Sequence, residues 1–367
     1  MSCRTLGCLF FKASDRSFWQ FLSYVRARTV PRTPWLSDNL QPTAQDFAAE
    51  YPVHTPEAAA LANPPGDRIQ AVWIGHATLL VQMDGLTFLT DPIFSERCSP
   101  ISFMGPRRVV PPAMQPLDAS FPHIDFIVLS HNHYDHLDRP SVLRLRDKFG
   151  DKLRWYVPLR LGKWFAAAGI TNVVEMDWWD EVQHPGSSVT ITMTPAQHWS
   201  VRVSTPLYSD KRRTLWGGYA IRGRSGSFWF AGDTGYCPVF KEIGSRLGPF
   251  DLSAIPIGAY EPRWFMKPQH CSPEEAVTIH KEVKSKRSIG IHCATFYLAD
   301  DSMDAPYMEL QEAAESQGLS TGEFAVPQHG VLLRTGEKVP DDLLLGTNRQ
   351  KSGEGKWSVV TRLQKSV

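Results

Sequence analysis

The sequence has no excess of either charge and no long apolar run. Lysine and arginine (39) nearly balance aspartate and glutamate (38), so no global field favours nucleic acid as a partner. No apolar stretch approaches the roughly 18–20 residues that cross a bilayer. The stretch from Leu6 to Phe11, between Arg4 and Lys12, is too short for a secretory signal. These absences indicate a protein that neither spans a membrane nor is secreted.

Paired cysteine spacings are also missing. The six cysteines are scattered along the chain, which suits free thiols in a reducing compartment better than a disulfide framework. The remaining composition is ordinary, because 42% of the 367 residues are hydrophobic and 21% are charged, as in soluble globular proteins. A chain of this length can bury one large core or two modest ones.

Changes in residue composition and hydrophobic pattern divide the chain into three predicted parts. Residues 1–66 form an N-terminal extension, 67–336 the main domain, and 337–367 a polar, flexible tail. In the extension, apolar residues on one helical face lie beside several arginines. This face indicates either a helix packed on the main domain or a helix lying in a membrane interface. A proline-rich stretch follows and is typical of an extended wrap or linker. The residues of the apolar face are Phe18, Phe21, Leu22 and Val25.

Short apolar runs from Ala71 onward predict strands, and helical patterns come between the later ones. Asp84-Gly85 between two such runs indicates a hairpin. Strands early in the chain, then strands alternating with helices, favour an α/β fold with helices layered over sheets. The predicted strands are 71–74, 78–82, 86–90, 125–129, 155–157, 189–194, 228–231, 252–256 and 288–291, and the predicted helices are 141–149 and 273–283.

The strongest local signal is SHNHYDHLD at residues 130–138, directly after a buried-strand pattern. Three histidines and an aspartate within six positions would be costly to bury unpaired. A solvated polar turn is the alternative, but turns favour Gly, Asn, Asp and Pro over histidine. Because histidine is a preferred zinc ligand, the segment predicts a metal site.

The spacing within this segment suits two metal ions. His131 and His133 alternate by two, so an extended segment points both side chains to one side. Asp135 and His136 lie where a turn could aim them at a second ion. One catalytic zinc ion takes about three protein ligands and an open position, so two ions need further ligands from elsewhere in the chain.

Three further candidates each follow an apolar run, where α/β folds gather functional residues. They are His198, Asp233 and His292. A single histidine at the end of a strand would more often be structural. Three such residues that complete one motif make a shared metal site the better interpretation.

With these ligands the chain resembles the metallo-β-lactamase superfamily, whose pattern is His-x-His-x-Asp-His, a lone His, a Gly-Asp and a late His. Longer stretches between about residues 71 and 333 resemble the N-acyl-phosphatidylethanolamine-hydrolysing phospholipase D family within it. The stretches are WIGHAT (73–78), FLTDPIF (88–94), SHNHYDHLD (130–138), MDWW (176–179), QHW (197–199), AGDTGYCP (231–238) and IPIGAYEPRWFM (255–266).

The resemblance implies an αββα sandwich, two mixed sheets flanked by helices, with two zinc ions per chain. Two close cations can generate a nucleophile from water at neutral pH. The implied metal ligands are His131, His133 and His198 for the first ion, Asp135, His136 and His292 for the second, and Asp233 as a bridge.

The resemblance also implies roles beside the ions. Asp135 and Asp233 are implied to be catalytic as well as ligands. His270 matches a family active-site histidine and is the candidate proton donor to the leaving oxygen, with a plain surface histidine as the alternative. His76 and Asp91 either orient metal ligands or have a structural role near the hairpin.

The implied reaction is phospholipase D-type hydrolysis of N-acyl-phosphatidylethanolamine to N-acylethanolamine and phosphatidic acid. The chain departs from the family pattern at Ser102, Arg139 and Val201. These changes leave the metal ligands intact and bear on acyl-chain preference. The side chains expected to line the lipid path, with core packing as the competing explanation for most, are Phe103, Met104, Tyr260, Arg263 (near the phosphate), Trp264 and Gln269.

Two rival functions remain open on the sequence. A cytosolic lactonase or other phosphodiesterase of the same fold has no use for the amphipathic N-terminal face. A zinc-binding protein without catalysis has no need of a bridging carboxylate such as Asp233. The expected partners are a phospholipid substrate and a membrane surface, bound peripherally, with no nucleic acid and with a homodimer as one possible assembly. The expected location is intracellular, on an endomembrane or the cytosolic face of a membrane.

Overall fold

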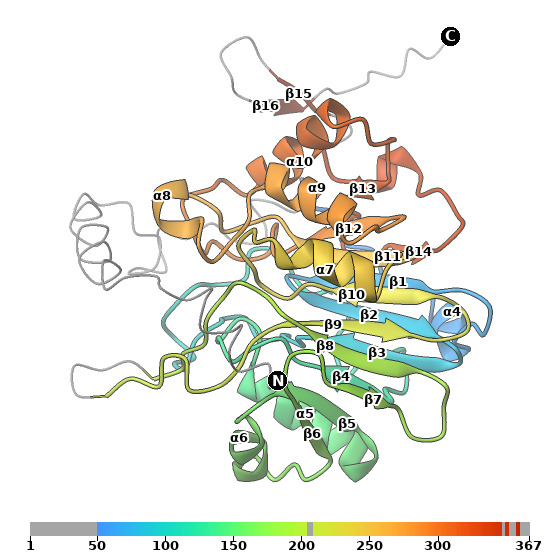
Figure 1. Cartoon of the computed structure of the whole chain (residues 1–367), viewed down its shortest axis with the longest axis vertical. Coiled ribbons are helices and arrows are strands. Elements are labelled where there is room, and N and C mark those ends of the chain that lie inside the picture. Colours follow the sequence, from blue (N-terminus) through green and yellow to red (C-terminus); the bar gives the residue numbers. More distant parts are fainter. Residues whose placement is uncertain (1–49, 204–207, 347–348, 352–356, 360–367) are drawn as a thin grey trace. The chain divides into compact units, whose positions relative to one another are not determined.

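The computed structural model describes residues 50–203, 208–346, 349–351 and 357–359 (Figure 1). The predicted apolar face of Phe18, Phe21, Leu22 and Val25 lies outside these residues. The main domain contains two seven-stranded mixed sheets, and a separate two-stranded sheet joins β15 (Arg349–Lys351) and β16 (Trp357–Val359). The α/β class predicted from the sequence is confirmed.

The first sheet has the strand order β14-β1-β2-β3-β4-β5-β6. Strands β14 to β3 pair antiparallel, and β3 to β6 pair parallel. The predicted hairpin joins β2 to β3 through Asp84 and Gly85, which both have positive φ, as its tight turn requires. The bounds are β1 Gln70–Gly75, β2 Thr78–Met83, β3 Leu86–Thr90, β4 Phe126–Val128, β5 Arg154–Pro158, β6 Val173–Met176 and β14 Leu332–Arg334.

The second sheet has the order β13-β12-β11-β10-β9-β8-β7. Strands β7 to β10 pair antiparallel, and β10 to β13 pair parallel. The two sheets therefore share one design, an antiparallel part followed by a parallel part. The bounds are β7 Glu181–Gln183, β8 Thr190–Thr194, β9 Gly218–Arg222, β10 Ser227–Phe230, β11 Leu252–Pro256, β12 Ser288–Ile291 and β13 Phe324–Ala325.

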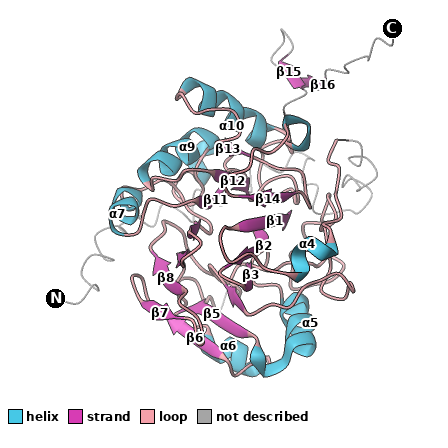
Figure 2. Cartoon of the chain, turned by 90° about the vertical axis from the view of Figure 1, so that its right-hand side faces the viewer, coloured by secondary structure: helices cyan, strands magenta, loops and turns pink. Residues whose placement is uncertain are grey.

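Helices cover the outer faces of the two sheets. Figure 2 shows α7, α9 and α10 along one side of the strands and α4 and α5 along the other. Helix α5 begins directly after the histidine motif, because the Asp138 side chain accepts a hydrogen bond from the Ser141 amide. Helix α9 begins with a capping box formed by Ser272 and Glu275. The bounds are α4 Ala58–Ala62, α5 Arg139–Phe149, α6 Gly162–Ala167, α7 Val239–Arg246, α8 Arg263–Met266, α9 Pro273–Glu282 and α10 Ala305–Ser316, with 3-10 turns at Gly150–Lys152 and Asp341–Leu343.

Aromatic packing between the sheets holds the sandwich together. The ring of Phe88 on β3 stacks on Phe126 of β4 at 4.7 Å between centroids, and lies 5.7 Å from Phe228 of β10 in the other sheet. A second apolar cluster joins the outer face of the first sheet to Val142 and Leu145 of α5. Because both faces of each sheet are covered, the central strands are buried along their whole length.

The packed domain extends past both predicted bounds, 67 and 336. Tyr51, from the proline-rich stretch, is buried in the core, and Leu61 of α4 packs on the first sheet. At the other end, Leu344 and Leu345 are buried, and the Leu345 amide donates to the Val326 carbonyl. Residues up to at least Leu345 thus belong to the core rather than to a loose tail.

Two sequence predictions concern membrane-spanning helices and cysteine pairing. No helix among the described residues is both long and apolar enough to cross a bilayer. The prediction of free thiols is confirmed for the four described cysteines, all buried: Cys98, Cys237, Cys271 and Cys293.

Candidate metal centre

The ionisable side chains of the candidate site follow strands of both sheets. In the first sheet, His76 follows β1 and the segment 130–138 follows β4. In the second, His198, Asp233 and His292 follow β8, β10 and β12. Strands β1 and β4 run in one direction within their sheet, as do β8, β10 and β12, so their carboxyl ends share an edge. This topology brings residues more than 200 positions apart into one cluster.

Three imidazoles form the first group of ligands. The Nε2 atom of His131 lies 2.8 Å from Nδ1 of His133, which lies 3.2 Å from Nε2 of His198. Ligand atoms of one tetrahedral zinc ion stand about 3.3 Å apart, since each zinc–nitrogen distance is about 2.05 Å. The three nitrogens therefore have the spacing of ligands around a single ion.

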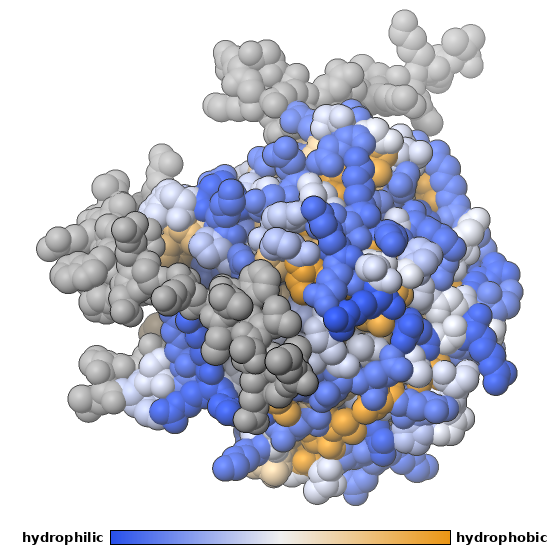
Figure 3. Space-filling view, viewed as in Figure 1, coloured by the Kyte–Doolittle hydropathy of each residue, from blue (hydrophilic) through white to orange (hydrophobic). Residues whose placement is uncertain are grey.

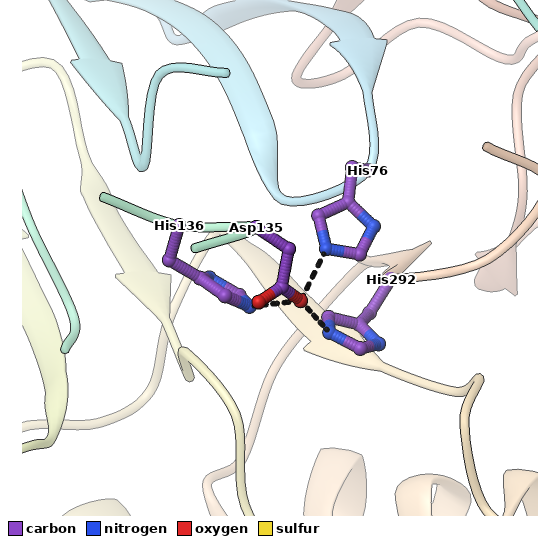
Figure 4. Close-up of side chains that lie close together, drawn as sticks. All are labelled: His76, Asp135, His136 and His292. Atoms are coloured by element: carbon purple, nitrogen blue, oxygen red, sulfur yellow. Dashed lines mark hydrogen bonds and ion pairs between the residues drawn. The ribbon is translucent and has the colours of Figure 1, made fainter. Parts of the chain in front are cut away.

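The second group centres on the Asp135 carboxylate. Its Oδ2 atom lies 3.2 Å from Nε2 of His136 and 3.3 Å from Nε2 of His292. The Nε2 atom of His76 is 3.0 Å from the same oxygen. Figure 4 shows the three rings converging on this carboxylate from separate elements. These four side chains form a second cluster that could hold a metal ion.

The Asp233 carboxylate lies between the two groups. Its Oδ2 atom is 3.1 Å from Nε2 of both His136 and His292, in the second group. The same atom is 3.8 Å from Nε2 of both His131 and His198, in the first group. One carboxylate oxygen thus contacts ligands of both groups, which is the position of a bridging ligand.

Buried polar atoms without hydrogen bonds show that the residues fit a metal centre. Among the described residues, Nε2 of His136 and His292 and Oδ1 of Asp233 are buried and have no hydrogen-bond partner. Leaving such atoms unpaired is costly. Imidazole nitrogens and carboxylate oxygens are the ligand types that zinc takes, so cations would satisfy this donor set.

Burial keeps the first group neutral. It lowers the pKa of His133 to about 3 and of His198 to about 4, and it also lowers the pKa of His131, with neighbouring histidines adding to the effect on His131 and His133. A neutral imidazole has a free lone pair and is the form that binds metal.

In the second group, by contrast, the carboxylates raise the pKa of His136 and His292. Burial alone would lower the pKa of His292, but Asp233 and Asp135 raise it to about 9, and the pKa of His136 is raised likewise. Burial would raise the pKa of both carboxyl groups, but the adjacent histidines hold it well below the usual value. In the metal-free protein, protons on the two rings thus balance the carboxylates, and cations would replace these protons.

Hydrogen bonds from outside the two groups orient the ligand rings. Asp91 accepts from Nδ1 of His136 at 2.6 Å and from the Ser130 amide at 2.7 Å. The Gln269 carbonyl lies 2.9 Å from Nδ1 of His198. Each contact fixes the tautomer that turns Nε2 toward the cluster. The structure therefore supports the orienting role for Asp91, and for His76 through Asp135, over a structural role near the hairpin.

The backbone around the cluster is strained. His76, His292 and Ala294 have φ of 54°, 61° and 46°, in the left-handed region that residues with a Cβ seldom adopt. Thr295 holds these loops together, because its Oγ1 accepts from the His76 amide at 2.8 Å and donates to the Cys293 carbonyl at 2.9 Å. No sequence signal marked Thr295. Strain of this kind collects at functional sites.

His270 lies beside the cluster and is buried, not a surface histidine. Its ring centroid is 5.2 Å from those of both His198 and His292. The Nδ1 atom of His270 has no hydrogen-bond partner among the described residues. The ring can therefore offer a polar atom to a substrate held near both groups.

The predicted lipid-path residues do not share one environment. Phe103, Met104 and Trp264 are exposed, at 73%, 49% and 54%. Arg263 donates to Glu275 at 2.8 Å and to the His270 carbonyl at 2.9 Å, so it supports the loop that carries His270.

Tyr260 and Gln269 also differ from the expectation that their side chains line the lipid path. Tyr260 is only 2% exposed, and burial together with the Glu309 carboxylate raises the pKa of its hydroxyl. Core packing, the competing explanation, describes Tyr260 best. The backbone carbonyl of Gln269 is hydrogen-bonded to Nδ1 of His198. The type of its side chain could not predict this contact.

Comparisons with known proteins agree with this geometry. A family model described as "Beta-lactamase superfamily domain" matches residues 87–293. The chain is 45% identical to "N-acyl-phosphatidylethanolamine-hydrolyzing phospholipase D 1" of Caenorhabditis elegans, over 71% of this chain and 72% of that protein. It is 32% identical to "N-acyl-phosphatidylethanolamine-hydrolyzing phospholipase D, mitochondrial" of Saccharomyces cerevisiae, over 72% of this chain and 56% of that protein.

A solved structure shows the same fold at lower identity. It is the isothiocyanate hydrolase from Delia radicum gut bacteria, with a TM-score of 0.55 and 18% identity over 72% of this chain and 98% of that chain. At this identity the likeness is one of fold alone.

Proposed function

The chain belongs to the beta-lactamase superfamily and, within it, to the family of N-acyl-phosphatidylethanolamine-hydrolysing phospholipases D, and from this membership we propose that it hydrolyses N-acyl-phosphatidylethanolamine with two zinc ions. The products are N-acylethanolamine and phosphatidic acid. The phosphodiester bond that breaks joins phosphorus to the ethanolamide oxygen.

One observation carries the proposal: Asp233 Oδ2 reaches both ligand groups, at 3.1 Å in one and 3.8 Å in the other. Two zinc ions held there would supply a nucleophile from water and neutralise charge on the phosphate oxygens. A protein that only stores zinc gains nothing from a carboxylate shared between two groups. The bridging position therefore supports catalysis.

The surrounding side chains prepare the site for a charged phosphate. The first-group histidines are neutral and bind cations without competition from protons. Asp91 and the Gln269 carbonyl keep the His136 and His198 rings in place while the substrate enters. Burial of these atoms excludes water that would screen the phosphate from the cations.

His270 acts as a hydrogen-bond donor in this account rather than as a cationic acid. Burial holds the pKa of His270 well below its usual value, and nearby divalent cations would lower it further. The neutral ring keeps one N–H, which it donates to a phosphate oxygen or to the leaving ethanolamide oxygen. This proposed role differs from the sequence expectation that His270 delivers the proton; here the leaving oxygen takes its proton from the water that is consumed in the hydrolysis.

Peripheral membrane contact is part of the proposal, because the substrate is a bilayer lipid. Phe103 and Met104 are exposed on the loop before Arg108, whose side chain lies over the Phe296 ring, itself 5.3 Å from the ring of His76. Trp264 is exposed on α8, whose chain leads to His270. Figure 3 has the same view as Figure 1 and shows hydrophobic residues, in orange, at the surface in the region of α8. Exposed aromatic and apolar groups near a site are suited to a lipid interface.

The test offers the protein vesicles of mixed phospholipids and identifies the products by mass spectrometry. We expect N-acylethanolamine and phosphatidic acid to appear together, and only when N-acyl-phosphatidylethanolamine is present. Flotation of the same vesicles separates the proposal from a cytosolic lactonase or phosphodiesterase, which would stay in the aqueous fraction. Turnover of soluble esters with no change in any phospholipid would contradict the proposal.

A further inference from the structure

The turn from His133 to His136 carries three of the seven proposed metal ligands on four consecutive residues. Its own backbone supplies two hydrogen bonds, from the His136 and Leu137 amides to the His133 carbonyl, at 3.1 and 2.8 Å. Both bonds are made by backbone atoms and end on one carbonyl, so they do not by themselves fix where the ligand side chains lie. Contacts from outside the turn must therefore hold it in the binding conformation.

Arg202 makes such contacts at both ends of the turn. Its Nη1 atom donates to the Asn132 carbonyl at 2.9 Å and to the Leu137 carbonyl at 2.7 Å. One nitrogen thus fixes the separation of the residues that flank the three ligands. Hydrogen bonds from a charged donor are stronger than those between neutral groups.

Tyr134 ties the middle of the turn to the same arginine. The Arg202 guanidinium lies 4.0 Å from the centre of the Tyr134 ring, which is cation–π geometry. In return, the Tyr134 hydroxyl donates to the Arg202 carbonyl at 2.9 Å. Because the side chain of each residue contacts the other, neither can move without breaking two kinds of contact.

The backbone of Arg202 is anchored independently of the turn. The amides of Arg202 and Val203 both donate to Oδ1 of Asp210, at 2.9 Å each. Within the described residues, no carboxylate forms an ion pair with the guanidinium. Burial lowers its pKa below the usual value, but an arginine stays charged. The charge is therefore directed to the carbonyls and the Tyr134 ring of the metal-binding turn and, at 5.5 Å, to the ring of Trp164 on α6.

We infer that Arg202 and Tyr134 are a positioning pair, which holds His133, Asp135 and His136 in the geometry that binds the two ions. This inference rests on the metal centre of the proposed function. It assigns the pair no contact with substrate. Losing the pair would let the turn relax and would weaken metal binding at both groups, since the turn contributes ligands to each.

The test compares metal retention in Arg202→Met with the wild type. Methionine keeps an unbranched apolar stem and removes the charge and every donor. We expect half of the zinc to be lost at a chelator concentration about tenfold to a hundredfold lower, the usual effect of removing a group that orients ligands. We also expect the visible spectrum of the cobalt-substituted protein to change, because it reports ligand geometry. Arg144→Met, at an exposed arginine of α5, is the matched control and should change neither readout.

Two milder variants refine the result. Arg202→Lys keeps a charged donor but loses the planar stack, so its zinc retention should fall between those of the wild type and Arg202→Met. Tyr134→Phe keeps the ring and loses one hydrogen bond, so retention should fall about two- to tenfold. If Arg202→Met does not fold, Tyr134→Phe decides the matter.

The outcomes separate this inference from the function on which it rests. A wild type that binds no metal overturns both. A wild type that binds metal, with Arg202→Met or Tyr134→Phe retaining it equally well and showing the same cobalt spectrum, overturns the inference alone. A lower unfolding temperature with unchanged metal retention would also overturn it, because the pair would then serve only the fold.

Discussion

Replacing Asp233 by asparagine removes the one charge that both ligand groups share and keeps the size of the side chain. In the wild type, Oδ2 is 3.1 Å from Nε2 of His136 and His292, and 3.8 Å from Nε2 of His131 and His198. An amide oxygen could replace one of these contacts but carries no charge, and an amide nitrogen binds no cation. Both proposed ions therefore lose a ligand at once.

The expected magnitude follows from comparison with outer-shell groups. Removing a residue that only orients a metal ligand costs tenfold to a hundredfold in metal affinity. A ligand shared by two ions should cost more than a hundredfold, which corresponds to more than about 2.7 kcal/mol. Turnover should fall well over tenfold, beyond the ~1.4 kcal/mol of a single lost hydrogen bond.

The assay measures zinc content after dialysis at fixed free zinc, together with turnover of the vesicle substrate. Asp147→Asn is the matched control, because Asp147 is an exposed aspartate of α5 that pairs with Arg146. The control should keep wild-type zinc content and rate. If Asp233→Asn keeps two ions per chain and near-normal turnover, Asp233 is not a bridging ligand and the division into two metal groups is wrong.

Three further predictions follow from the chain. Elemental analysis of freshly purified protein should find close to two zinc ions per chain, and one or none would contradict the two-ion centre. Deleting residues 1–30, which contain Phe18 and Phe21, should release the protein from vesicles in flotation; equally tight binding would place the anchor elsewhere, with Trp264 the next residue to test. Burial, reinforced by Arg108, lowers the pKa of His329 from 6.5 to about 3. As the pH falls, the unfolded chain therefore binds a proton at this histidine before the folded chain does. The contribution of His329 to the free energy of unfolding of the metal-free protein should therefore be complete above pH 6.5 and be lost toward pH 3. His329→Gln should reduce the slope of this free energy with pH, over that range, by up to about 1.4 kcal/mol per pH unit in denaturant titrations; an unchanged slope would show that His329 is not held neutral.

The side chains of the candidate metal centre could be predicted because their signals are local and independent. The motif around His131 has a spacing that few structural segments share, and His198, Asp233 and His292 each follow a strand with a clear apolar pattern. Parallel strands place such residues at a common edge. The structure brings these predicted ligands together within two connected groups.

Other features depend on contacts that no local pattern encodes. No sequence pattern singles out Arg202, and its contacts with the histidine motif form only when the chain after β8 packs against that motif. Tyr260 lies in a family block beside Arg263, yet its side chain is buried in the core, where Glu309 of the distant helix α10 helps to raise its pKa. Strand β7 has only three residues, so its alternation of exposed and partly buried side chains is too short to predict a strand.

The domain edges were missed for a related reason. Tyr51 lies in a proline-rich stretch and Leu344 in a polar one, so composition pointed away from packing. Both are nevertheless buried, because distant segments supply their partners: the Tyr51 hydroxyl lies 3.3 Å from that of Tyr307, and Leu344 forms a β-bridge with Pro327. Composition describes a segment, whereas burial depends on what packs against it.

The central claim is that this chain breaks the bond between phosphorus and the ethanolamide oxygen of N-acyl-phosphatidylethanolamine. Metal chemistry alone does not choose between the two ester bonds, because the choice depends on which oxygen lies in line with the attacking one. Turnover in water labelled with oxygen-18 makes the choice visible. We expect the label in phosphatidic acid and none in the N-acylethanolamine. Label in the N-acylethanolamine, or release of diacylglycerol in place of phosphatidic acid, would contradict the account.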